Sequence, residues 1–112
     1  MVVGDHLDFL YNLPGPLPAG DYSILVHAYA SAAGGVLQAE LDVVGAEVSV
    51  LTVQTYTVPA SNPMASGTLI NADVSLPAFD AGCADVLRLR VSMPSGPSGS
   101  YFNFIQPTVA LP

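Results

Sequence analysis

Residues 36–58 read VLQAELDVVGAEVSVLTVQTYTV, and this stretch decides the fold. Its first part places a polar residue at every second position from Gln38 to Asp42, the period of a strand with one buried face. Gly45-Ala46 then predicts a tight turn, and the β-branched run Val48–Val58 predicts a second strand. The stretch as a whole therefore predicts an antiparallel hairpin.

The rest of the chain is built in the same way. Short runs rich in Val, Leu, Ile, Thr and Tyr lie between clusters of Gly, Pro, Ser and Asn, and no apolar pattern with helical spacing extends over a dozen residues. We expect strands at Leu7–Tyr11, Tyr22–Ala30, Val36–Val43, Val48–Val58, Thr68–Leu76, Val86–Met93 and Tyr101–Val109. This pattern predicts an all-β protein, a single β-sandwich of seven or eight antiparallel strands of the jelly-roll type.

A length of 112 residues allows one domain. The segment 13–18, which reads LPGPLP, is too rich in proline for the interior of a sheet. We therefore divide the chain into an N-terminal arm at residues 1–18, with a candidate first strand and a proline-rich connector, and a sandwich domain at residues 19–112.

The charge composition is unusual. The chain has no Lys, its only basic residues apart from two His are Arg88 and Arg90, and nine acids give a net charge of -7. Hydrophobic residues make up 51% and charged residues only 10%, against roughly a quarter charged in ordinary soluble domains. Since a small sandwich core cannot hold this many apolar residues, we expect a substantial protein–protein interface. The alternative is a dispersed surface rich in Ala and Pro.

The acidity also excludes several classes of partner. Binding to nucleic acid or to an anionic membrane surface needs clustered Lys and Arg, which this chain does not have. Its apolar runs are too short to span a bilayer. Met1–Leu10 contains acids and no Lys or Arg, unlike a secretory signal, so we expect either cytosolic synthesis or a leader that has been removed.

No residue pattern indicates catalysis. The only candidate bases near neutral pH are His6 and His27, and no Ser stands in a Gly-x-Ser-x-Gly motif. We expect His27 to be a half-buried packing residue. Cys83 has no basic neighbour that would activate it, and we interpret it as a small apolar residue, with an intermolecular disulfide as the alternative. The chain is predicted not to be an enzyme and to need no cofactor.

Carboxylates in loops provide weak candidates for a metal site. Asp80 and Asp85 bracket a loop, Asp73 precedes it on a predicted strand, and Ca²⁺ takes oxygen ligands of this kind. The sequence Asp5-His6-x-Asp8 is a second conceivable cation site. Acids in such positions are usually solvated, and we expect no bound metal.

Two sets of residues are candidates for the interface. Arg88 and Arg90 share one strand face and either pair with Glu40, Asp42 or Asp73 on neighbouring strands, or bind carboxylates of a partner protein. The arm supplies four apolar side chains that are costly to leave in water, and we expect them to anchor the chain to its neighbours: Phe9, Leu10, Tyr11 and Leu13.

Three segments carry a resemblance to small jelly-roll domains: GDYSILV at residues 20–26 with the following Gly-Gly turn, LDVVG at residues 41–45, and LRLRV at residues 87–91. This rhythm resembles the calcium-binding carbohydrate-binding modules of secreted glycosidases. Such modules usually present Trp or Tyr platforms to sugars, and here Trp is absent.

In size, composition and fold type the chain is also similar to the decoration, or cement, proteins of tailed-bacteriophage capsids. That resemblance implies a non-enzymatic structural protein on the outer capsid surface of the virion. Its partners would be a major shell protein and further copies of itself, for example in a trimer. The alternative function is a carbohydrate-binding module of a secreted, extracellular protein.

Overall fold

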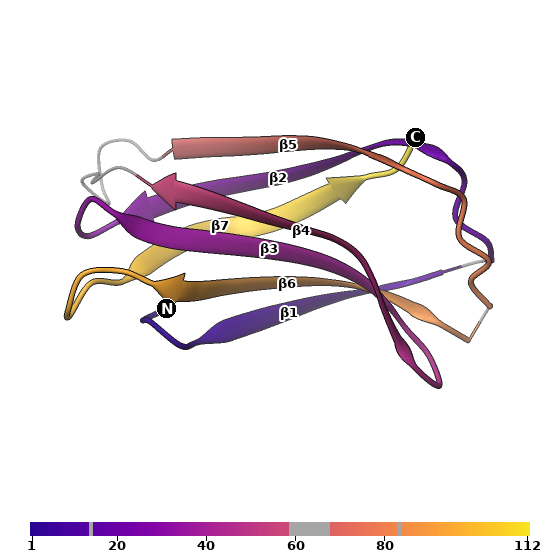
Figure 1. Ribbon diagram of the computed structural model, residues 1–112, viewed down its shortest axis with the longest axis horizontal. Coiled ribbons are helices and arrows are strands. Elements are labelled where there is room, and N and C mark those ends of the chain that lie inside the picture. Colours follow the sequence, from indigo (N-terminus) through magenta and orange to yellow (C-terminus); the bar gives the residue numbers. More distant parts are fainter. Residues whose placement is uncertain (14, 59–67, 83) are drawn as a thin grey trace.

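The computed structural model describes residues 1–13, 15–58, 68–82 and 84–112, and within them it contains seven strands and no helix (Figure 1). Each strand begins and ends within two residues of its predicted range: β1 His6–Asn12, β2 Gly20–Ala30, β3 Gly35–Val44, β4 Val48–Val58, β5 Thr68–Leu76, β6 Val86–Ser95 and β7 Phe102–Ala110. No helix in the described ranges has the length and apolar character to cross a membrane. The prediction of an all-β protein is confirmed.

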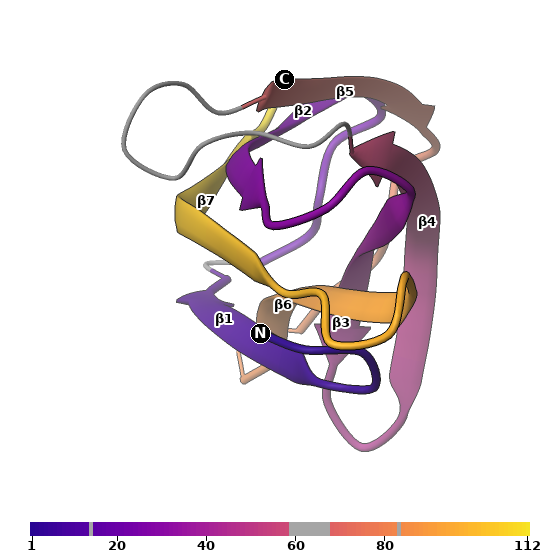
Figure 2. The same cartoon turned by 90° about the vertical axis from the view of Figure 1, so that its left-hand side faces the viewer.

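The strands form two antiparallel sheets. One has four strands in the order β1-β6-β3-β4, and the other has three in the order β5-β2-β7. In Figure 1 the strands run along the long axis of the molecule, and Figure 2, turned by 90°, shows the two sheets facing each other. The single β-sandwich is therefore confirmed, with seven strands.

The pairing of the strands is nested along the chain. Strand β3 pairs with β4 as a hairpin, β2 pairs with β5 outside it, and β1 pairs with β6 outside both. A jelly roll is wound on the same scheme, usually from eight strands in two sheets. The seventh strand here, β7, is added beside β2 instead. The jelly-roll type stays a prediction.

The core lies between the two sheets and comes from the alternation read in the sequence. On the four-stranded sheet Leu41 of β3 stands opposite Leu89 of β6, and both are fully buried, as is Leu37 farther along β3. Tyr22 and Ile24 of β2 face them from the other sheet and are buried as completely. Because successive side chains of a strand point to opposite sides, the intervening residues of β3 must lie outside the core.

Residues 1–18, predicted as an arm, lie within the sandwich. Strand β1 is paired with β6 along its whole length. Leu13 and Leu17, on either side of the proline-rich connector, are buried in the core, and Leu17 exchanges backbone hydrogen bonds of 2.8 and 3.0 Å with Phe79. Pro14 lies outside the described residues. The backbone hydrogen bonds and the burial tie this segment to its own chain.

The edge between β1 and β7 is partly closed by the beginning of the chain. The amino group of Met1 donates to the carbonyl oxygen of Phe102 at 2.9 Å, and the Phe102 N–H donates to the Met1 carbonyl oxygen at 2.8 Å. Farther along the same edge, the Tyr11 hydroxyl donates to the Pro107 carbonyl oxygen at 3.3 Å. These bonds join the two sheets on one side of the sandwich.

Two glycines explain the sharp connection between β2 and β3. Gly34 has a φ of 91°, a left-handed conformation that favours glycine. Gly35 packs under the buried ring of Phe102, and an added Cβ would lie 2.9 Å from the Cζ of that ring. The Gly-Gly pair read as a turn in the sequence is thus required both by the backbone and by packing.

Candidate docking face

The outward surface of the four-stranded sheet combines ion pairs with exposed apolar side chains. In the pairing register, Asp8 of β1 stands opposite Arg90 of β6, and Arg88 of β6 stands opposite Asp42 of β3. We call this surface the outer face. It includes Asp8, Leu10, Gln38, Glu40, Asp42, Val48, Val50, Val53, Arg88 and Arg90.

The strongest polar contact of the outer face joins Arg88 to Asp42. Both Nε and Nη2 of Arg88 donate to Oδ2 of Asp42, at 3.0 and 2.7 Å. The guanidinium also lies 4.0 Å from Glu40, and the Asp42 side chain is completely buried beneath its neighbours. Alternation correctly places Asp42 outside the core, yet Asp42 has no contact with solvent. A buried charge of this kind depends on its partner.

Arg90 is bound by an acid that was not among its expected partners. Its Nε donates to Oδ1 of Asp8 at 2.7 Å, and its Nη2 donates to Oδ2 at 2.9 Å, so the contact is bidentate. This hydrogen bond lowers the pKa of Asp8 and raises that of Arg90. Asp8 was read as part of a conceivable cation site, and only the pairing of β1 with β6 brings it to Arg90.

Glu40 and Asp42 form a pair of neighbouring carboxyl groups. Within the described residues no N–H or hydroxyl donates to Oδ1 of Asp42, although this atom is buried. A hydrogen bond with Asp42 raises the pKa of Glu40, and burial raises it further, whereas Arg88 and Arg90 act in the opposite direction. Asp42 and burial thus oppose ionisation of Glu40, and the two arginines favour it.

The apolar part of the outer face lies mainly on β4. Val48, Val50 and Val53 are 53%, 54% and 45% exposed, and they follow one another along the strand. The sequence does not single them out as interface residues, because a run of β-branched residues is equally typical of a buried strand. The position of β4 at the end of its sheet leaves them in water.

The four expected anchor residues are divided by the alternation of β1. Leu10 points to the outer face and is 63% exposed, whereas Leu13 is 5% exposed and belongs to the core. Phe9 and Tyr11 point to the inner side and pack against the core while partly exposed. Of the four, Leu10 is the side chain that the surface presents most fully.

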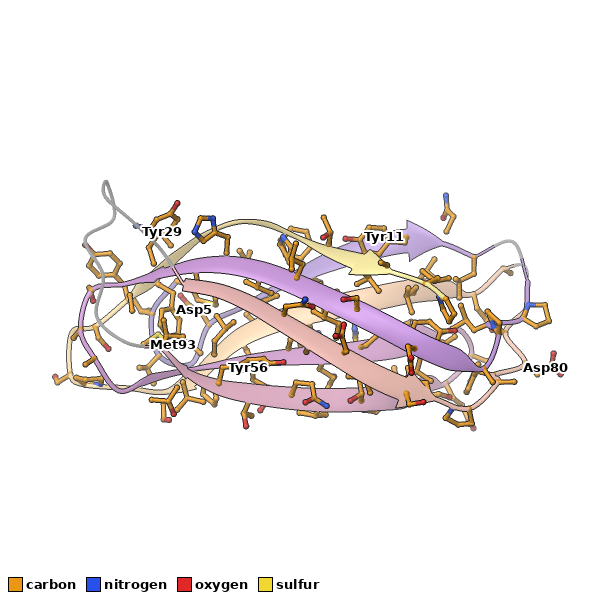
Figure 3. The ribbon with its side chains drawn as sticks, turned by 90° about the horizontal axis from the view of Figure 1, so that it is seen from above. Asp5, Tyr11, Tyr29, Tyr56, Asp80 and Met93 are labelled. Atoms are coloured by element: carbon orange, nitrogen blue, oxygen red, sulfur yellow. The ribbon has the colours of Figure 1, made fainter. Side chains whose placement is uncertain are left out.

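The three carboxylates named as weak metal candidates do not converge. Asp73 lies on β5 and accepts a hydrogen bond of 2.7 Å from the Ser23 hydroxyl. Asp85 accepts one of 2.9 Å from the Gly82 N–H, and Asp80 points away from one end of the molecule (Figure 3). Among the residues that the structure describes, no three His, Cys, Asp or Glu side chains are grouped to hold a metal ion.

The two histidines lie on different sheets. His6 begins β1 and is exposed, while His27 is half-buried on the outward side of β2, as expected. The ring of His27 lies beside Tyr29, with a centroid distance of 5.0 Å and an interplanar angle of 32°. In Figure 3 Tyr29 points outward near the end of the molecule opposite Asp80. Cys83 lies outside the described residues.

Compared with known proteins, this chain matches no protein family, no curated protein and no solved structure. What it can do must therefore be argued from its own surface. The outer face holds two Arg–carboxylate contacts, with exposed apolar side chains on both edges of the sheet. Such a surface is suited to binding another protein surface.

Proposed function

We propose that this chain is a non-enzymatic structural protein that attaches to a larger protein assembly through its outer face. The observation that carries the proposal is the row of exposed valines Val48, Val50 and Val53 beside two arginines that are already paired within the chain. Complete burial of an exposed valine contributes about 1.5–3 kcal/mol, and since about half of each of these side chains is already covered, each adds roughly half of that on binding. The apolar side chains favour association, and the paired charges limit its desolvation cost.

The distribution of charge supports the choice of this face. The outer face carries the three carboxylates that the two arginines contact, so its net charge is small. The other six acids lie in turns, in loops or on the opposite sheet: Asp5, Asp21, Glu47, Asp73, Asp80 and Asp85. A partner on the outer face therefore meets few unpaired charges, whereas a partner elsewhere would have to desolvate several.

The proposed setting is the outer surface of a viral capsid, where the chain would act as a decoration protein on the major shell protein. A net charge of -7 suits the outside of a shell better than the nucleic acid within it. The partner surface is expected to be apolar and nearly uncharged, because the face that meets it has the same character.

Carbohydrate binding is the second candidate, and one feature of the other sheet favours it. His27 and Tyr29 lie side by side on the outward surface of β2, and the hydroxyl of Ser23 joins Asn71 and Asp73 at 2.9 and 2.7 Å on the same surface. Aromatic rings next to amide and carboxylate groups are what a sugar-binding surface needs. The two proposals thus use opposite sheets of the sandwich.

The test uses virus particles purified from the native source of the chain. We expect the full-length protein to sediment with these particles, and we expect Val50→Lys to abolish this sedimentation. The matched control is Leu25→Lys, because Leu25 is also exposed but lies on the outward surface of β2. Sedimentation unaffected by Val50→Lys but abolished by Leu25→Lys would overturn the assignment of the face.

The same protein is tested against insoluble cellulose and xylan. We expect no retention on either polysaccharide. Retention that is lost in Tyr29→Ala, together with no binding to particles, would replace the structural proposal by the carbohydrate-binding one.

A further inference from the structure

The four edge strands of the sandwich differ in how they are protected. Natural sheet edges carry charges, prolines or short strands that prevent them from pairing with other chains. Strand β1 contains Asp8, β5 contains Asp73 and β7 contains Pro107, and β1 is also hydrogen-bonded to β7. The eleven residues of β4 include no charged residue and no proline.

One side of β4 is occupied and the other is open. Along its whole length β4 pairs with β3, with one bulge near Leu51. Among the described residues no strand is hydrogen-bonded to its other side, because β4 ends the sheet order. Backbone N–H and C=O groups on that side form a template for another strand.

The sequence of β4 indicates what that strand is. VSVLTVQTYTV carries no charge, and the side chains that it presents on the outer face are all β-branched: Val48, Val50, Val53, Thr55 and Thr57. An antiparallel copy would therefore place β-branched side chains opposite one another on that face. Since the whole chain carries a charge of -7, an uncharged edge is also where two copies meet with least repulsion.

We propose that β4 pairs antiparallel with β4 of a second copy of this chain, so that two four-stranded sheets become one sheet of eight strands. This pairing deepens the proposed function. The dimer rests on that function only for the role that it would serve, which is attachment to a larger assembly. Pairing of the two edges brings the valine rows of both copies together in the middle of one continuous outer face. The dimer would thus double the apolar surface offered to the larger assembly.

Two Gln→Lys substitutions separate pairing of the edge from docking of the face. Gln54 of β4 stands opposite the buried Ala39, so its side chain is on the inner side of the edge strand, where it donates to Thr52 at 2.8 Å. In Gln54→Lys the ammonium group can reach water around a free edge but not around a paired one. Gln38→Lys makes the same change of charge one strand inward, on the outer face.

The oligomeric state is measured by size-exclusion chromatography with light scattering over a wide range of protein concentrations. We expect the wild type and Gln38→Lys to form dimers, and we expect Gln54→Lys to weaken dimerisation by about 100-fold or more, because an unpaired ammonium would be buried. Circular dichroism establishes that all three proteins are folded. A monomeric wild type, or equal dimerisation of folded Gln54→Lys, would overturn the proposal.

A cross-linking experiment tests the pairing geometry. In a Cys83→Ser background, Val53→Cys should form an intermolecular disulfide under mild oxidation, because the two-fold axis would pass near residue 53. Leu10→Cys, on the opposite edge of the same sheet, should not. Cross-linking of Leu10→Cys alone would show that another edge makes the dimer.

The outcomes also distinguish this proposal from the function on which it rests. Dimers of the free protein that do not sediment with virus particles would overturn the function and leave the β4 pairing in place. Particle binding by a protein that is monomeric in solution and uncross-linked at Val53→Cys would overturn the pairing and leave the function in place.

Discussion

At the residue scale, the carboxyl pair of Glu40 and Asp42 is the most consequential detail of the outer face. Two acids that are two residues apart on one strand are common, because water normally screens the repulsion between their charges. Here Asp42 is completely buried against Arg88, and one guanidinium serves two carboxyl groups. The hydrogen bond with Asp42 raises the pKa of Glu40, and burial raises it further.

The raised pKa of Glu40 makes the stability of the fold depend on pH. An acid whose pKa is raised by folding binds its proton more tightly in the native state, so it contributes stability at low pH. This contribution is lost as the pH rises from the ordinary pKa of Glu, about 4.3, through the raised value. Asp8 acts in the opposite sense, because its lowered pKa gives stability that is lost as the pH falls.

We predict that Glu40→Gln increases stability at neutral pH, by about 1 kcal/mol or less in the free energy of unfolding. The Gln amide can donate to Asp42 at any pH, and it removes the loss of stability that accompanies ionisation of Glu40. Urea unfolding followed between pH 4 and neutrality, the window set by the ordinary pKa of Glu, is the measurement. Glu47→Gln makes the same charge change at an exposed turn and serves as the control. A lower stability of Glu40→Gln at neutral pH would contradict the prediction.

At the scale of the element, β1 shows how one strand serves both the core and the surface. Its residues alternate between the outer face and the inner side, and the chain beyond it enters the core at Leu13. The segment that reads as an arm is hydrogen-bonded along β6, so its removal would leave that edge of β6 unpaired and take Leu13 out of the core. We therefore expect deletion of Met1–Leu13 to unfold the protein.

Two Leu→Ala substitutions measure this difference without a deletion. We predict that Leu13→Ala lowers the free energy of unfolding by about 2–5 kcal/mol, because it removes a buried side chain and leaves a cavity. Leu10→Ala, the same change at an exposed position, should cost less than about 0.5 kcal/mol. Thermal and urea unfolding of both variants provide the comparison. Similar losses would show that Leu13 does not belong to the core in solution.

At the scale of the whole molecule, the low charge content determines how association should respond to salt. Both arginines are engaged within the chain, and the exposed large side chains of the proposed docking face are apolar. We predict that binding to virus particles survives high salt, because screening weakens exposed ion pairs but leaves apolar burial intact. Sedimentation over a series of NaCl concentrations tests this. Release of the protein at moderate salt would show that charged contacts hold the complex.

The substitution Arg88→Ala tests whether this arginine stabilises the fold or binds a partner. Removing one partner of a buried ion pair leaves the other charge unpaired, at a cost of about 3–5 kcal/mol. Arg88→Ala should therefore reduce the stability of the fold, through Asp42, rather than the affinity for a partner. The Arg90 pair is more exposed, and its loss should matter less.

The sequence alone determined the class of fold and nearly all strand limits. Alternation with a period of two, as in the stretch from Gln38 to Asp42, specifies which side chains enter the core, and Gly, Pro and Asn clusters specify where strands end. These are local properties of the chain, so no tertiary information was needed. The same alternation correctly placed Leu37 and Leu41 inside and the polar residues of β3 outside.

Only the tertiary structure decided which strands are neighbours and which lie at an edge. Asp8 and Arg90 are 82 residues apart, and the antiparallel pairing of β1 with β6 makes their bidentate contact possible. Similarly, Val48, Val50 and Val53 are exposed because they lie on the outward side of β4, where the order of the sheet ends. A strand pattern reports the two faces of a sheet, but strand order depends on contacts between distant segments. The ion pairs and the open edge are therefore properties of the fold.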